Sequence, residues 1–300
     1  MCRKTTDLIN SFEYAGSLYL FEDTPKKTEI KIYSPSILNK QFNYESLIDQ
    51  LMDINIYYSL TYNEISRLKA DDKLGFLSRL ARSKFREYSK NDGESGEILL
   101  YSFLEGDLKA PKILSKMSLK TNPNLYVFGA DGVHFFVDEN NKYHIIYGEA
   151  KMYKRVSLGL TKAFDSIGRF ISNYGTDAKL MEDTLIRENV TKEKLTDEQK
   201  QKIIEIVYPS PKQNTINYSD DFGIFIGYEI SIKDDWKLLS DDEFRKLILK
   251  ESIEKVNNQL DKIQNLIKKY NLISRDFYFY MMPFTEIGKT RKKIIEGITK

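Results

Sequence analysis

Apolar residues recur along this 300-residue chain at two spacings, which separate the expected strands from the expected helices. Alternating or continuous runs of β-branched and aromatic residues predict strands at 14–22, 28–33, 112–121, 125–138, 143–153, 222–232 and 275–284. Apolar positions three or four residues apart predict helices within 44–88 and at 94–104, 157–174 and 241–270, with a polar helical stretch that ends at 207. This order predicts an α/β or α+β fold in which helices flank a central mixed sheet.

The chain changes character near residue 90, where the helical pattern is interrupted. We expect residues 1–90 to form a strand-plus-helix extension that packs on a core made by residues 91–300. Within 241–270 the apolar positions repeat in steps of four and three, which predicts either a core helix or a coiled-coil seam that faces a partner. These positions are Leu249, Ile253, Val256, Leu260, Ile263, Ile267 and Tyr270. Residues 289–300 are expected to form a charged tail.

Composition excludes several classes of protein. The single cysteine, Cys2, cannot form an internal disulfide, and two histidines with one cysteine cannot supply a zinc finger or a tri-histidine zinc site. No apolar run approaches the roughly 18 residues of a membrane span, and the first residues lack the apolar stretch of a signal peptide, so we expect a cytoplasmic protein. The 46 basic and 44 acidic residues give a net charge of +2, which taken alone argues against a polyanion partner.

The sharpest local feature is Gly148-Glu149-Ala150-Lys151, near the end of an expected strand. Side chains alternate across a strand, so Glu149 and Lys151 share one face, while Gly148 and Ala150 share the other, where a helix can pack closely. A carboxylate and an ammonium group on one face resemble half of a metal-hydrolase site. The acid would bind the ion, and the lysine would orient or activate water near a scissile phosphate.

Two further acids are expected beside this pair. Asp131 lies between glycines on the preceding strand, where unusual backbone angles and close approach of a ligand are allowed, and a hairpin would bring it beside Glu149. Glu97 lies on the apolar stripe of the helix before the sheet, where an unpaired carboxylate costs free energy. Glu94, one turn earlier, is a weaker candidate for the same role. Three carboxylates and a lysine match the needs of Mg²⁺-dependent phosphodiester hydrolysis, with Mn²⁺ as a second candidate ion.

Each of these residues also has a purely structural interpretation. A Glu-x-Lys triplet is common in charged chains and usually belongs to a solvated face, and Asp131 between glycines can be an ordinary turn residue. His134 and His144 fall on the expected hairpin and are interpreted as strand residues. A histidine-based HNH-type nuclease site would leave Lys151 unexplained. The combination of the three segments favours the metal site.

The same three segments, in this order, carry a resemblance to a known family. They are Gly93-Glu94-Ser95-Gly96-Glu97, Gly129-Ala130-Asp131-Gly132-Val133-His134 and Gly148-Glu149-Ala150-Lys151. Together they resemble the HamA family, the nuclease subunits of the Hachiman anti-phage system, within the PD-(D/E)xK nuclease superfamily. Alanine stands at position 130, where the superfamily motif has proline. The resemblance, over about residues 90–175, implies a PD-(D/E)xK core held inactive by a helicase partner, HamB, and released to degrade DNA when the helicase senses aberrant DNA.

Local charge beside the candidate site differs from the near-neutral total. Residues 109–120 and 151–162 each contain four basic residues and no acid, a local charge of +4 apiece. A nucleic-acid backbone suits such stretches because phosphate contacts do not depend on base sequence. A solvated basic strand edge is the alternative. The candidate nucleic-acid contacts are Lys112, Lys116, Lys120, Lys154, Arg155 and the ring of Tyr153.

The sequence therefore favours a Mg²⁺-dependent DNA endonuclease with little sequence preference. Asp131, Glu149 and Glu97 would hold the ion, and Lys151 would stabilise the attacking water or the developing charge. A non-catalytic subunit that binds DNA or the helicase, and an RNA-cutting nuclease of the same superfamily, remain as alternatives. The segment 283–290 is not a P-loop, because proline stands where the first glycine is required. We therefore expect this chain to bind no nucleotide itself, and any ATP-driven step to belong to a partner.

Overall fold

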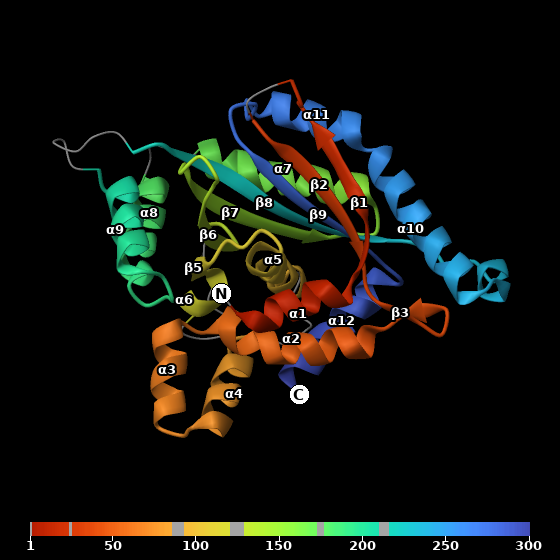
Figure 1. Cartoon of the computed structure of the whole chain (residues 1–300), viewed down its shortest axis with the longest axis horizontal. Coiled ribbons are helices and arrows are strands. Elements are labelled where there is room, and N and C mark those ends of the chain that lie inside the picture. The colour runs from red at the N-terminus through yellow and green to blue at the C-terminus, as the bar shows by residue number, and fades with distance from the viewer. Residues whose placement is uncertain (1, 24–25, 86–92, 121–128, 173–176, 210–215) are drawn as a thin grey trace.

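Seven strands form one mixed sheet at the centre of the molecule (Figure 1). The computed structural model describes residues 2–23, 26–85, 93–120, 129–172, 177–209 and 216–300. The sheet strands are β1 (Glu13–Leu20), β2 (Thr28–Ser34), β5 (Lys112–Ser115), β6 (Gly132–Val137), β7 (Tyr143–Met152), β8 (Tyr218–Glu229) and β9 (Phe277–Phe284). Their order is β1-β2-β9-β8-β7-β6-β5; the middle four pair in parallel, and the outer pairs are antiparallel. β3 (Ile37–Leu38) and β4 (Gln41–Phe42) form a separate small hairpin.

Helices cover both faces of this sheet (Figure 1). One face packs against α1 (Arg3–Ser11), α2 (Tyr44–Ser59), α5 (Glu94–Gly106) and α12 (Ile287–Thr299). The other packs against α7 (Val156–Ser172), α10 (Asp241–Asn257) and α11 (Leu260–Lys269). The remaining helices are α3 (Tyr62–Ala70), α4 (Leu74–Ser83), α6 (Lys116–Leu119), α8 (Asp177–Val190) and α9 (Asp197–Val207). The predicted central mixed sheet flanked by helices is confirmed, and no helix in the described ranges is long and apolar enough to cross a membrane.

Helix α5 lies close to the sheet because small residues line the contact. A Cβ atom on Gly148 in β7 would lie only 3.0 Å from Leu100 in α5. A Cβ atom on Gly96 in α5 would lie 3.4 Å from the Cβ of Ala150. As predicted, β7 therefore turns Gly148 and Ala150 towards a closely packed helix, and a larger side chain at either glycine would push α5 outward.

Two C-terminal elements differ from the sequence prediction. The expected helix at 241–270 is interrupted: α10 ends at Asn257, and the N–H of Asn258 bonds to carbonyls of the last turn. Two consecutive asparagines are poor helix formers, which accounts for the break. The apolar seam is therefore not continuous, and Val256 and Ile263 are buried in the core, which favours the core-helix interpretation. The expected charged tail at 289–300 instead forms most of α12, an amphipathic helix with buried isoleucines.

Several expected strands are shorter in the structure: of the described residues in 125–138 only Gly132–Val137 form a strand, and the strand expected at 222–232 ends at Glu229. The run predicted at 112–121 ends as a strand at Ser115, because the Ser115 hydroxyl accepts the N–H of Ser118 at 3.1 Å and so caps α6. Parts of the predictions at 86–88, 121–128 and 173–174 lie outside the described residues.

The N-terminal strands belong to the same sheet as the C-terminal strand. β2 pairs in parallel with β9, with Thr28 opposite Phe277 and Ile32 opposite Met281. The sheet thus joins both ends of the chain, while the division at residue 90 into extension and core stays a prediction.

Candidate acidic site at the end of the central sheet

Asp131 immediately precedes β6, where the hairpin with β7 holds it in place. Its N–H donates to the carbonyl of Gly148 at 3.0 Å, and its own carbonyl accepts the N–H of Lys116 at 3.1 Å. Its carboxylate accepts the N–H of Ala150 at 2.9 Å and lies 3.4 Å from the Lys116 ammonium group. The β6–β7 pairing therefore brings Asp131 beside the strand position of Glu149, as the expected hairpin required.

The chain just before Asp131 needs a glycine. Gly129 has φ +110°, in the left-handed region, and a Cβ there would lie 2.3 Å from a carboxylate oxygen of Glu182. The unusual backbone angle expected from the sequence is therefore present at Gly129.

Glu149 and Lys151 form an ion pair near the C-terminal end of β7. They occupy alternate strand positions, opposite in orientation to the small residues that face α5. About a quarter of the Lys151 side chain is exposed (23%), whereas the Glu149 side chain is 12% exposed. The lysine therefore forms the solvent side of the pair.

The two acids of α5 have different surroundings. The Tyr58 hydroxyl donates to Glu97 at 3.0 Å, and Tyr58, Glu97 and Asp131 line one pocket of about 10 Å³, the size of a single water. Glu94 instead forms a buried ion pair with Lys120. Of the two, Glu97 is the acid that shares a pocket with Asp131.

Burial and mutual repulsion perturb this cluster. Burial, reinforced by the negative charge of Asp131, raises the pKa of Glu97 to about 7 and the pKa of Glu149 to about 7. Burial opposes the charged form of Lys151, but the carboxylates of Glu149 and Asp131 together raise the pKa of its ammonium group. Asp131 thus repels both Glu97 and Glu149 where water screens the charges poorly, which is the environment that favours a bound cation.

The donor set fits a hard divalent cation such as Mg²⁺, because all three groups are carboxylates. Three acids, Glu97, Asp131 and Glu149, face two lysines, Lys116 and Lys151, so one negative charge is left uncompensated. They do not form a closed ligand shell: in the described part of the chain, the one trio of such side chains with all ligand atoms within 4.8 Å lies elsewhere. Binding an ion between these three carboxylates would require their side chains to move closer together.

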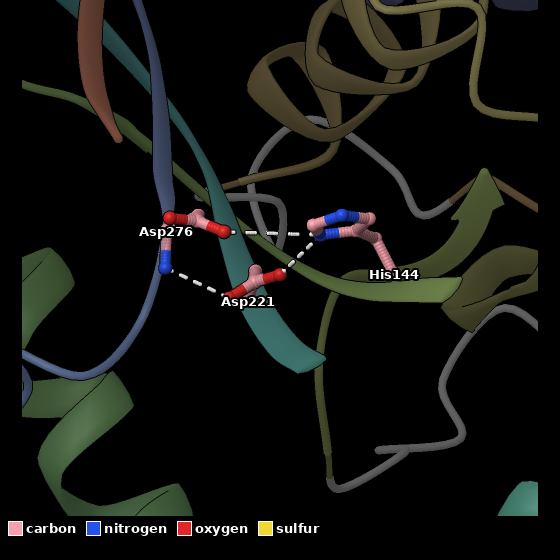
Figure 2. A group of neighbouring side chains, drawn as sticks. All are labelled: His144, Asp221 and Asp276. Carbon is pink, nitrogen blue, oxygen red and sulfur yellow. Dashed lines mark hydrogen bonds and ion pairs between the residues drawn. The ribbon is translucent and has the colours of Figure 1, made fainter. Parts of the chain in front are cut away.

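That compact trio is His144, Asp221 and Asp276, at the opposite end of β7 (Figure 2). Asp221 lies 2.7 Å from His144 Nδ1, Asp276 lies 3.9 Å from the same atom, and the N–H of Asp276 donates to Asp221 at 2.7 Å. Lys26 and Lys142 lie 3.6 and 3.8 Å from the Asp276 carboxylate. These contacts join the starts of β7, β8 and β9.

The second ring nitrogen of His144 also faces a carboxylate, Asp138, at 3.3 Å. Three acids, two lysines and one imidazole therefore contact one another in this group. Its residue types would suit a metal, but its observed contacts describe a buried ion-pair network that ties the strands together. His144 and His134 both lie on strands, as the sequence indicated.

Two of the six candidate nucleic-acid contacts are buried. Lys112 donates to the carbonyls of Tyr57 and Leu60, each at 2.8 Å, and lies 3.4 Å from Glu193. Lys120 is paired with Glu94 in α5 and is equally buried. A contact between nucleic acid and either lysine would require these internal interactions to break.

The other candidates lie nearer the surface. Lys154 has 78% of its side chain exposed beside Glu229, and Arg155 is exposed at the start of α7. Tyr153 is half-buried, with its backbone N–H bonded to β8. Lys116 lies at the acidic site itself, 3.4 Å from Asp131. These four can meet a phosphate backbone without dismantling the core.

Tyr58 is the residue of this site that the sequence did not reveal. It lies on α2, among apolar positions spaced as in any amphipathic helix, and its hydroxyl bond to Glu97 depends on tertiary packing. No local pattern distinguishes it from the other tyrosines of the chain.

The fold and this cluster define a mixed α/β protein with buried carboxylates beside lysines at one end of its central sheet. The HamA family model matches residues 10–298, nearly the whole chain, and the chain therefore belongs to the HamA family. Membership makes it a component of the Hachiman anti-phage defence system, which has more than one subunit. The resemblance carried by the three sequence segments is thereby confirmed. A comparison with curated proteins finds no match.

Proposed function

We propose that the chain is a metal-dependent DNA endonuclease, the effector of its defence system, restrained by a helicase partner. The observation that carries the proposal is the acidic cluster, in which Asp131 contacts the backbone between Glu149 and Lys151 while Glu97 faces the same pocket. Buried carboxylates with pKa values raised to about 7 are costly to the fold, and a bound cation would offset that cost.

In this proposal Asp131 and Glu149 hold Mg²⁺, or Mn²⁺ in its place, and Glu97 is the helix ligand. Glu97 is preferred to Glu94 because Glu94 is already neutralised by Lys120. The ion, when bound, polarises the phosphate and lowers the pKa of a coordinated water. Lys151 orients that water and stabilises negative charge on the phosphate from the solvent side of the cluster.

The substrate would follow the exposed basic residues beside β7. Lys154 and Arg155 lie only a few positions beyond Lys151, so a phosphate backbone held by them would pass the acidic cluster. Such contacts carry no base information, and cleavage should show little sequence preference. The near-neutral net charge of +2 predicts weak binding elsewhere on the protein, which suits a nuclease that a helicase partner must hold in check.

Plasmid cleavage by a double variant tests this proposal. Glu149→Gln with Lys151→Met should lower Mg²⁺-dependent nicking of supercoiled DNA by at least about 10³-fold, because both the ion's ligand and the stabilising ammonium group are lost. Glu251→Gln with Lys255→Met is the matched control, because it removes an ion pair with the same change of charge from the surface of α10. Urea unfolding of both variants checks that the fold is retained.

Unchanged nicking by the Glu149/Lys151 variant would contradict the mechanism. Each assay is run with the chain alone and with its helicase partner, in Mg²⁺, Mn²⁺ and EDTA, on DNA and RNA side by side. DNA binding that survives EDTA without any cleavage in Mg²⁺ or Mn²⁺ would identify a binding subunit instead. Preferential loss of the RNA would identify a ribonuclease.

A further inference from the structure

Tyr58 is held by the packing of its ring and by a hydrogen bond from its hydroxyl. Its side chain is almost fully buried, with 1% of the residue exposed, and its hydroxyl donates to Glu97 Oε2 at 3.0 Å. The ring packs against Tyr101 at 5.6 Å and Phe85 at 6.2 Å between ring centroids. Because the ring is held by packing, the hydroxyl has a defined direction, and so does the carboxylate oxygen that accepts from it.

The backbone of Tyr58 holds the other side of the same site. Its carbonyl accepts the hydroxyl of Ser115 at 2.7 Å, and Ser115 caps the short helix α6. The first residue of α6 is Lys116, whose ammonium group lies 3.4 Å from Asp131. Tyr58 therefore contacts one candidate ligand through its side chain and supports the lysine beside another through its main chain.

We propose that Tyr58 is a positioning residue of the metal site, which orients Glu97 so that one carboxylate oxygen is held by the hydroxyl and the other is presented to the ion. This inference rests on the proposed function, because it takes Glu97 as a ligand. It assigns a role at the site to α2, in the part of the chain that carries none of the nuclease-like motifs. A hydrogen bond that orients a ligand carboxylate removes a rotational freedom that binding would otherwise have to remove.

The test is the Mn²⁺ affinity of Tyr58→Phe, measured by electron paramagnetic resonance and calorimetry without any substrate. Loss of the hydroxyl should weaken Mn²⁺ binding by about 10-fold or more, as removal of a group that orients a metal ligand usually does. The matched control is Tyr280→Phe: Tyr280 is equally buried, and its hydroxyl donates to Asp107 at 2.9 Å. Both variants should lose stability to a similar extent, but Tyr280→Phe should keep the wild-type Mn²⁺ affinity.

A double variant separates positioning from a general loosening of the fold. In a Glu97→Gln background, Tyr58→Phe should change Mn²⁺ affinity less than twofold, because the carboxylate that it orients is already gone. Wild-type affinity in Tyr58→Phe, or equal weakening by Tyr280→Phe, would overturn the inference and leave the proposed function intact. Absence of Mn²⁺ binding in the wild type, or binding that survives Asp131→Asn, would instead overturn the proposed function and this inference with it.

Discussion

Replacing Lys112 by methionine should destabilise the fold rather than remove a contact with nucleic acid. Only 3% of the Lys112 side chain and 6% of its partner Glu193 are exposed, so water screens their interaction little. Removing one partner of a buried pair leaves the other charge uncompensated and costs about 3–5 kcal/mol. The carbonyls of Tyr57 and Leu60, which each accept from the ammonium group at 2.8 Å, lose their donor as well.

The loss of stability caused by Lys112→Met depends on pH, because the carboxyl group of Glu193 gains or loses a proton. Burial raises the pKa of this carboxyl to about 7 from an ordinary value of 4.5, and the charge of Lys112 opposes the rise. The folded protein therefore binds an extra proton between those two values, and stability falls as the pH rises through that window. Without Lys112 the pKa of Glu193 rises further, so the fall continues to higher pH. The difference in the free energy of unfolding between Lys112→Met and the wild type should therefore grow above neutral pH.

Urea unfolding at two pH values measures this effect. We expect Lys112→Met to lose about 2 kcal/mol at about pH 6, from the lost hydrogen bonds, and about 4 kcal/mol at about pH 8.5. Adding Glu193→Gln should recover part of the loss at the higher pH, whereas Lys154→Met at an exposed site should cost less than about 0.5 kcal/mol. Wild-type stability in Lys112→Met, together with weakened DNA binding, would refute the structural assignment.

Two further outcomes follow from the same structure. The affinity for Mg²⁺, measured by calorimetry, should rise about tenfold or more between about pH 6 and pH 8, because Glu97 and Glu149 have pKa values near 7 and must lose their protons to bind an ion; an affinity independent of pH would contradict this. Gly106→Ala should cost about 1–3 kcal/mol in urea unfolding, because its Cβ would lie 2.5 Å from the carbonyl of Thr5. Gly75→Ala, with nothing within 4 Å, should be neutral or slightly stabilising, and equal effects of the two would show that crowding is not the cause.

The central hairpin and its residues could be predicted because their pattern is local. Strand periodicity alone places Glu149 and Lys151 on one face of β7 and Ala150 on the other, and the glycines around Asp131 mark a special backbone position. The seven-strand order was not predictable in the same way. The pairing of β2 with β9 joins segments at opposite ends of the chain, and no local pattern in either segment indicates which strand it pairs with.

The partners of buried charges were equally hidden. Lys112 and Lys120 lie in a stretch without acids, which favoured a nucleic-acid surface. Their partners are Glu193, in the loop between α8 and α9, and Glu94, the first residue of α5, and only the folded structure brings them within reach. Local net charge therefore overstates the basic surface when the compensating acids are remote in sequence. The break after α10 was missed for a simpler reason: apolar spacing continues across two asparagines that end the helix.

The position of β9 between β2 and β8 affects how the protein can be made. The N-terminal hairpin of β1 and β2 has its parallel neighbour only after residue 284 has left the ribosome. A two-stranded hairpin on its own is marginally stable, so the hairpin must wait, incompletely ordered, while the rest of the chain is translated. Chains that terminate early therefore carry an open edge on β8 instead of a completed sheet. Completion of the sheet therefore requires residues 277–284, which are translated long after the hairpin that they pair with.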